Sequence, residues 1–175
     1  MDEKKYNIQP IDDFTGDTRG KRKLEWFIDD VFSVIKKYIR GDVIDIGCGN
    51  GRLNPLILPL CTSLVCVDPV CELDSRFKKN AQFISSHLHE LSNKVEQKFD
   101  TILFFGSYYI IANQYGAKTF EYCNAILNKD GTIIFMVDAK DDMLFDNVPD
   151  TYELVLHHIT DNIPSSLRVY TRRSK

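Results

Sequence analysis

Apolar residues in this chain recur first at helical spacing and then in short unbroken runs. Between Lys21 and Ile39 they return every three or four positions with charged residues between them, which predicts an amphipathic helix ending near Gly41. Dense runs of β-branched and other apolar residues predict buried strands. Such runs occupy residues 42–47, 63–68, 81–85, 99–106 and 132–139.

The segments between these runs predict helices and turns. A short helix follows the first run, residues 87–97 read as a loop or ragged helix, residues 107–128 as mostly helical, and residues 129–131 as a turn. Alternation of strands and helices through residues 43–139 predicts a parallel sheet covered on both faces. After a polar connection over residues 140–150, two further strands at 152–160 and 166–173 have no helix between them. We therefore expect seven strands, the last of them antiparallel.

Composition and length place the chain among ordinary globular proteins with one domain. Of its 175 residues, 43% are hydrophobic and 27% are charged, which excludes collagen and bulk disorder. Residues 1–19 are polar and are predicted to form an N-terminal arm that closes over a site as a lid, whereas residues 20–175 form a single domain. The net charge of −3 gives no general attraction to nucleic acid or to an anionic membrane. No run of apolar residues is long enough to predict a membrane-spanning helix.

Cysteine and histidine usage favours a reduced compartment and no metal. The five cysteines are an odd number and no secretory leader precedes them, so we expect free thiols and a cytoplasmic protein. Cys61, Cys66 and Cys71 recur every five positions, but Cys66 lies in a predicted buried strand. His87 and His89 have the spacing of a metal pair without a third ligand nearby, so no metal site is predicted.

A glycine loop and a later carboxylate carry the candidate chemistry. Asp45 and the glycines of the segment Gly47-Cys48-Gly49-Asn50-Gly51 come directly after a predicted strand and before a predicted helix. Gly47 permits a tight turn, while Gly49 and Gly51 leave bare backbone for a ligand. Asp68 ends the next strand, where a carboxylate accepts both hydroxyls of a ribose. The structural alternative is a tight turn and a helix cap, but the full arrangement favours a nucleoside site.

The sequence VIDIGCGNGR resembles the first motif of the class I S-adenosylmethionine-dependent methyltransferase family. Its third glycine comes one residue earlier than in the dinucleotide fingerprint G-x-G-x-x-G, which makes a nicotinamide-dependent oxidoreductase the least favoured alternative. The resemblance covers roughly residues 24–173 and implies an α/β, Rossmann-like three-layer sandwich with a seven-stranded, mostly parallel sheet. It also implies an enzyme that uses S-adenosyl-L-methionine to methylate an oxygen or nitrogen of a small-molecule acceptor.

The same resemblance implies roles for individual residues. Asp45 would lie near the amino group of the cofactor and Asp68 would bind its ribose. The remaining cofactor-binding candidates border the methionine part, the adenine or the sulfonium: Gly47, Cys48, Gly49 and Gly51; Pro69, His87, Leu88 and His89; Phe104 and Phe105. Family members usually place an acid where His87 stands, and a neutral imidazole accepts a hydrogen bond without supplying that charge.

Candidate catalytic residues and two other functions complete the predictions. A general base is needed only if the acceptor must lose a proton, and Tyr109 or His157 is nominated for that role. The departure at His87 and the short connection after Asp68 keep open a catalytically silent binding or regulatory subunit. A basic C-terminus, formed by Arg168, Arg172, Arg173 and Lys175, keeps open an RNA methyltransferase. Nucleic acid remains the less favoured partner, and a homodimer or a partner protein is considered.

Overall fold

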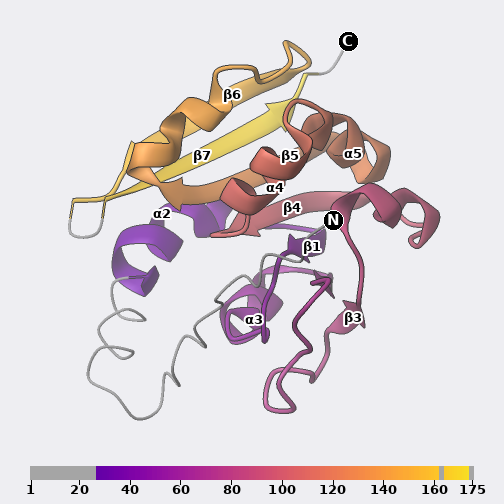
Figure 1. Cartoon of the computed structure of the whole chain (residues 1–175). Coiled ribbons are helices and arrows are strands. Elements are labelled where there is room, and N and C mark those ends of the chain that lie inside the picture. The colour runs from indigo at the N-terminus through magenta and orange to yellow at the C-terminus, as the bar shows by residue number, and fades with distance from the viewer. Residues whose placement is uncertain (1–26, 162–163, 174–175) are drawn as a thin grey trace.

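The computed structural model describes residues 27–161 and 164–173, which form one sheet with helices on both faces (Figure 1). In chain order the strands are β1 (Asp42–Ile46), β2 (Ser63–Val67), β3 (Gln82–Ile84), β4 (Phe99–Phe105), β5 (Leu127–Asp138), β6 (Tyr152–Ile159) and β7 (Ser165–Arg172). Their spatial order is β3-β2-β1-β4-β5-β7-β6, and β7 runs antiparallel to both of its neighbours. The predicted seven-stranded sheet with an antiparallel last strand is confirmed.

Alternation of side chains along the central strands divides the core into two layers. In β1, Val43 packs on one face and Ile44 on the other, as the two-residue period of a strand requires. One face is covered by the helices η1 (Phe27–Phe32), α2 (Ser33–Ile35), η2 (Lys36–Tyr38), α3 (Asn54–Ile57) and η3 (Leu58–Leu60). The other is covered by η4 (Leu88–Asn93), α4 (Tyr108–Tyr115), α5 (Lys118–Ile126) and η5 (Ala139–Phe145). Both layers surround a sheet that is buried at its centre.

Several boundaries differ from the sequence predictions. The segment expected to be mostly helical over 107–128 contains two helices, because the first of them ends at Gly116, whose φ is +56°. The turn expected at 129–131 lies inside β5, since Leu127 already pairs with Phe99 and the register shifts before Thr132. The polar connection over 140–150 contains the 3-10 helix η5.

The described part of the first predicted helix changes type along its length. It passes from a π-helix through one α-helical turn to a 3-10 helix that ends at Tyr38, three residues before the predicted end near Gly41. The N-terminal arm predicted over residues 1–19 lies outside the described residues. In the part of the chain that the structure describes, no helix is long and apolar enough to cross a membrane.

The strand order reverses at β1, and open α/β sheets bind their ligands in the crevice at such a reversal. From β1 the chain builds β2 and β3 on one side and then returns to place β4 on the other. The segments that follow β1 and β4 therefore turn in opposite directions, and the carboxyl ends of these strands are where a ligand is expected in such a sheet. Both the glycine loop and Asp68 follow strands that end at this edge.

Candidate functional site

The glycine loop is attached by backbone hydrogen bonds to the end of β2. Gly47 has a φ of +74°, and its N–H and that of Cys48 both donate to the carbonyl of Val67, at 2.7 and 3.1 Å. A Cβ added to Gly47 would lie 2.3 Å from the Cβ of Ser107, the residue just before α4. Gly47 is therefore required twice, for its positive φ and for the close approach of the chain that follows β4.

The three glycines of the loop serve different purposes. A Cβ on Gly51 would lie 2.5 Å from the Leu73 side chain, so this glycine permits tight packing. A Cβ on Gly49 would meet no atom within 4 Å, so its α-carbon faces open space. Gly49, whose φ is +57°, is thus the glycine that keeps the surface of the loop free of side chains.

Asp68 fixes the loop from the neighbouring strand. Its Oδ2 accepts a hydrogen bond from the Gly49 N–H at 3.1 Å, and its Oδ1 accepts from the N–H groups of Val70 and Cys71 at 2.9 and 2.7 Å. The residue is only 8% exposed. Because a carboxylate oxygen has two lone pairs, Oδ2 keeps acceptor capacity for a ligand hydroxyl. The predicted proximity of the glycine loop and Asp68 is thus a direct contact, with Pro69 exposed beside it.

Asp45 is a buried carboxylate whose hydrogen bonding is incomplete. It is 2% exposed, and among the described residues nothing donates a hydrogen bond to its Oδ1. Burial, helped by the nearby charge of Asp68, raises the pKa of Asp45 from 3.8 to about 7. A buried acid with a free oxygen beside an open loop fits a ligand that brings a cation or a hydrogen-bond donor. Such an acceptor fits the ammonium end of an amino-acid-bearing nucleoside.

Cys48 contributes a protonated thiol to the same loop. A hydrogen bond with Cys66, together with burial, raises the pKa of Cys48 far above its ordinary value. The thiol therefore stays neutral in the physiological range and does not act as a nucleophile there.

The three residues predicted to line the adenine differ in their exposure to solvent. His87 is exposed at the start of η4, Leu88 is buried, and His89 is exposed. The Nδ1 of His89 lies 2.8 Å from the hydroxyl of Tyr115, so this imidazole is engaged with α4. His87 is therefore the residue of this loop that remains available to a ligand at the carboxyl edge, whereas Leu88 packs in the core.

The two phenylalanines at the end of β4 point to opposite faces. Phe104 is fully buried and stacks on Phe135 at 5.1 Å between ring centroids. Phe105 is half-buried on the other face, where its ring meets that of Phe27 edge-on at 5.8 Å. Phe105 is therefore the more accessible of the pair, and Phe104 belongs to the core. Tyr109, 51% exposed in the first turn of α4, lies beyond them.

His157 belongs to a polar cluster on the outermost strand of the sheet, away from the glycine loop. It lies on β6, which β7 and β5 separate from β4. Its Nε2 is 3.3 Å from the Ser166 hydroxyl and 3.7 Å from Oδ1 of Asp142. Arg168 donates through Nε to the same Asp142 oxygen at 2.9 Å. Burial raises the pKa of Asp142, but hydrogen bonds from Arg168 and Ser166 outweigh that effect and hold the pKa below its ordinary value.

Two buried polar residues of the site carry no role in the sequence predictions. The Ser107 hydroxyl donates to the carbonyl of Ile46 and so joins the segment after β4 to the end of β1. Asn54 donates to the carbonyl of Phe77 at 2.9 Å and accepts from the thiol of Cys66 at 3.3 Å. The sequence signal that could have identified Ser107 is a polar side chain directly after a glycine at the end of a strand. Asn54, at the start of α3, carries no such signal.

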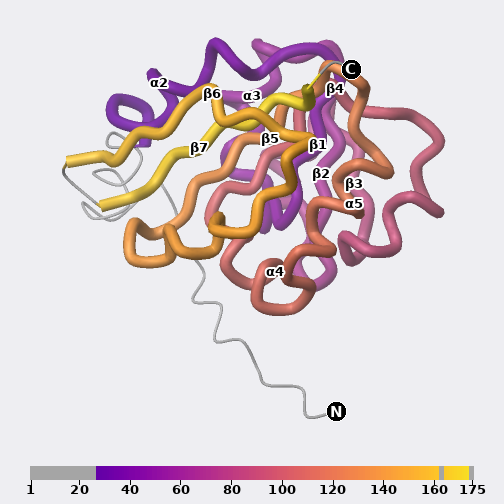
Figure 2. Tube along the Cα trace, turned by 90° about the horizontal axis from the view of Figure 1, so that it is seen from above, coloured from indigo at the N-terminus to yellow at the C-terminus, as the bar shows by residue number. Residues whose placement is uncertain are grey.

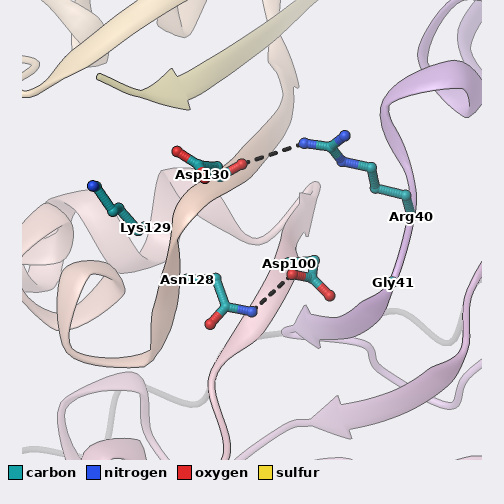
Figure 3. Close-up of a pocket in the computed structure, with 6 residues that line it drawn as sticks. All are labelled: Arg40, Gly41, Asp100, Asn128, Lys129 and Asp130. Carbon is teal, nitrogen blue, oxygen red and sulfur yellow. Dashed lines mark hydrogen bonds between the residues drawn. The ribbon is translucent and has the colours of Figure 1, made fainter. Parts of the chain in front are cut away.

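A concavity lies at the opposite, amino edge of the sheet (Figure 3). It measures about 520 Å³ and is lined by Arg40, Gly41, Asp100, Asn128, Lys129 and Asp130. Asn128 donates to Asp100 Oδ1 at 2.7 Å, and the backbone N–H of Asp42 donates to Asp100 Oδ2 at 2.9 Å. These contacts connect the starts of β1, β4 and β5, which is a structural role away from the glycine loop.

Solved structures with the same fold include several methyltransferases. SMU.1697c of Streptococcus mutans, crystallised in complex with SAH, aligns with a TM-score of 0.57 and 15% identity over 81% of this chain and 93% of that one. The N-methyltransferase NodS of Bradyrhizobium japonicum, in complex with S-adenosyl-L-homocysteine, aligns with a TM-score of 0.66 and 10% identity over 92% and 91%. An rRNA methylase of Streptococcus thermophilus aligns with a TM-score of 0.56 and 12% identity over 81% and 93%.

At these identities the likeness shows the fold alone. No curated protein matches the chain. A family model described as a methyltransferase domain matches residues 19–169, which is most of the sequence. With its glycine loop, its reversed strand order and this match, the chain belongs to the methyltransferase domain family.

Proposed function

We propose that the chain binds S-adenosylmethionine above the carboxyl ends of β1, β2 and β4 and methylates an oxygen or nitrogen of a small-molecule acceptor. The observation that carries this proposal is Asp45, a buried carboxylate with an unpartnered oxygen beside the glycine loop. Membership of the methyltransferase domain family supports methyl transfer as the reaction. Relatives of the same fold that were crystallised with SAH support the choice of cofactor.

Residues around the crevice would hold the cofactor by complementary contacts. The Asp45 carboxylate would accept hydrogen bonds from the ammonium group, and Asp68 would use its remaining acceptor capacity for the ribose hydroxyls. The open face of Gly49 admits the methionine part without a steric clash. Pro69 and His87 would border the adenine. When bound, S-adenosylmethionine supplies an electrophilic methyl group on a sulfonium.

Alignment and exclusion of water are the main tasks left to the protein. An in-line displacement at a methyl group disperses charge, so positioning can supply much of the rate acceleration. Phe105 and Tyr109 would form the apolar wall of the crevice on the acceptor side. A base is needed only where the acceptor loses a proton.

Tyr109 and His157 remain the proposed candidates for that base. Contacts of His157 Nε2 with Ser166 and Asp142 leave Nδ1 as the atom that receives a proton. The Asp142 carboxylate would then stabilise the imidazolium.

A small molecule is favoured over RNA as the acceptor. The chain carries a net charge of −3, and Arg168 of the predicted basic C-terminus is committed to Asp142 and Tyr170. Phosphate binding needs cations that are available to the ligand. The rRNA methylase of the same fold keeps RNA as the second candidate.

Calorimetric titration with S-adenosylmethionine and S-adenosylhomocysteine tests the proposal. We expect binding to the native chain, weaker binding to Asp45→Asn, and unchanged binding to the control Asp150→Asn, which alters an exposed acid. No binding at millimolar ligand would refute the cofactor assignment.

Transfer of a radiolabelled methyl group to metabolite extracts or to RNA then identifies the acceptor class. Labelling of RNA alone would favour the second candidate. Binding without transfer to any acceptor would instead favour a silent regulatory subunit.

A further inference from the structure

β6 forms one outer edge of the sheet, and we propose that it pairs, antiparallel, with β6 of a second copy of this chain. Within residues 27–161 and 164–173, β7 is the one strand that pairs with β6, and Figures 1 and 2 show β6 along the margin of the sheet. β6 spans eight residues, whereas β3 at the other edge spans three. A long edge strand offers unpaired backbone groups to another chain, and a short one offers few.

The side chains of β6 favour pairing. Leu154, Val155 and Ile159 are large apolar residues that are between 40% and 51% exposed. Natural edge strands are commonly protected by lysine or proline, and β6 contains neither. Its one carboxylate is Glu153, and its remaining polar residues are His157 and His158, both exposed. Such an edge has apolar side chains at its middle and complementary polar groups at its two ends. It therefore suits pairing with a second copy of the same strand that runs antiparallel to it.

The hydrogen-bond phase of β6 defines which backbone groups are free. Thr160 N–H donates to the Ser165 carbonyl, and Arg173 N–H donates to the Thr151 carbonyl. Facing residues of an antiparallel ladder alternate between bonded and non-bonded pairs. Counting inward from these two bonds, the backbone groups directed at β7 belong to Glu153, Leu156 and His158. The outward-directed groups are those of Leu154, His157 and Ile159.

A bulge makes this pattern self-complementary. The register between β6 and β7 shifts between Leu154 and Leu156, so Val155 is the extra residue. A two-fold axis between Val155 and Leu156 brings Leu154 opposite His157 of the second copy, with both backbones facing outward toward each other. In a regular strand the same axis would oppose an outward group to an inward one. The bulge therefore permits an antiparallel register, centred between Val155 and Leu156, that a regular strand would not allow.

This register places a hydrogen-bond acceptor of one copy opposite a donor of the other. Glu153 faces His158 of the second copy, and symmetry repeats that pair once more. Both side chains project from the same face of the sheet, because paired residues share a face and their partners on β7, Thr171 and Leu167, lie an even number of positions apart. Leu154 pairs with Tyr170 and projects from the other face. An imidazole N–H can donate a hydrogen bond to a carboxylate directly opposite it, whereas two carboxylates there repel each other. This polar complementarity favours a second copy as the partner.

Sedimentation velocity over a concentration series of the full chain tests the proposal by substitution of this pair. We expect a monomer–dimer equilibrium. Glu153→Lys removes the hydrogen-bond acceptor and His158→Glu opposes two carboxylates, so each should raise the dissociation constant of the dimer by about tenfold or more. The double variant Glu153→Lys/His158→Glu should recover the native value, because it places a lysine opposite a glutamate. Glu121→Lys, the same charge change at an exposed position of α5, is the matched control and should leave the constant unchanged.

Three results would overturn the proposal. They are a monomer at every concentration, a dimer indifferent to both single variants, and a double variant no better than its parents. Thermal unfolding confirms that each variant folds. Leu154→Lys, at an exposed apolar position opposite His157 of the second copy, provides an independent disruption if either charge variant fails to fold.

Discussion

Replacing Asp45 by asparagine should stabilise the folded chain at alkaline pH while weakening its proposed ligand binding. The native fold raises the pKa of this carboxyl from 3.8 to about 7. Ionisation is thus disfavoured in the folded state, so the destabilisation is absent below pH 3.8, grows through the interval to pH 7, and is complete above it. A difference of about three units corresponds to about 4 kcal/mol.

Asparagine removes that charge but buries an amide of similar shape. An amide without partners costs about 1–3 kcal/mol of its own. We therefore expect Asp45→Asn to raise the free energy of unfolding by about 2 kcal/mol near pH 8, equivalent to about 4–8 °C in Tm for a chain of this size. Near pH 4 the native carboxyl is itself neutral, so the advantage should vanish and the amide cost should leave the variant less stable by about 1–3 kcal/mol.

Urea unfolding at both pH values, with and without S-adenosylhomocysteine, measures these quantities. The ligand should stabilise the native chain more than the variant, because its ammonium group pairs with the carboxylate. A variant that is less stable than the native chain near pH 8 would refute the reasoning, since it would mean that the Asp45 charge is already compensated in the folded state. The exposed Asp150→Asn serves as a control that should change neither quantity.

Other substitutions separate folding from binding at the same site. Gly47→Ala adds a Cβ 2.3 Å from Ser107 and should lower the free energy of unfolding, measured in urea, by about 3 kcal/mol; a neutral effect would contradict the close approach. Gly49→Ala meets no atom within 4 Å, so calorimetry should show at least about a tenfold loss of cofactor affinity with only about 1 kcal/mol of lost stability. Ser107→Ala leaves the Ile46 carbonyl without its hydroxyl partner and should cost about 1–2 kcal/mol by the same unfolding assay; retention of full stability would show that water replaces the hydroxyl. His87→Asp supplies the charge that the adenine loop lacks, and titration should show cofactor binding tightened by up to about tenfold; weaker binding would place the adenine elsewhere.

Local sequence identified the features that depend on neighbours in the chain. Hydrophobic runs bounded by glycine located the strands, because burial on both faces requires an apolar run whatever surrounds it. The glycine loop and Asp68 were predictable for the same reason: a tight turn and a strand-end carboxylate are local properties. Their contact at 3.1 Å followed from parallel strands that end at a common edge. The antiparallel final strand followed from the missing helix between the last two runs.

Features that depend on contacts between distant segments could not be predicted from the sequence. The break at Gly116 was not predicted because helical spacing continues on both sides of it. The turn residues inside β5 were misassigned because pairing with Phe99 extends that strand past its local signals. In both cases long-range packing outweighed local propensity.

Residue order alone specifies the succession of strands and helices and the polar groups available at one edge of the sheet. The packing of distant segments makes some of these groups differ from their ordinary behaviour. Asp45 is an ordinary acid in the chain, and burial beneath the loop, together with the charge of Asp68, shifts its pKa. Ser107 and Gly47 are 60 residues apart, yet their contact fixes the loop. Desolvation and steric contact arise between distant segments, so they exist only once the fold has brought those segments together.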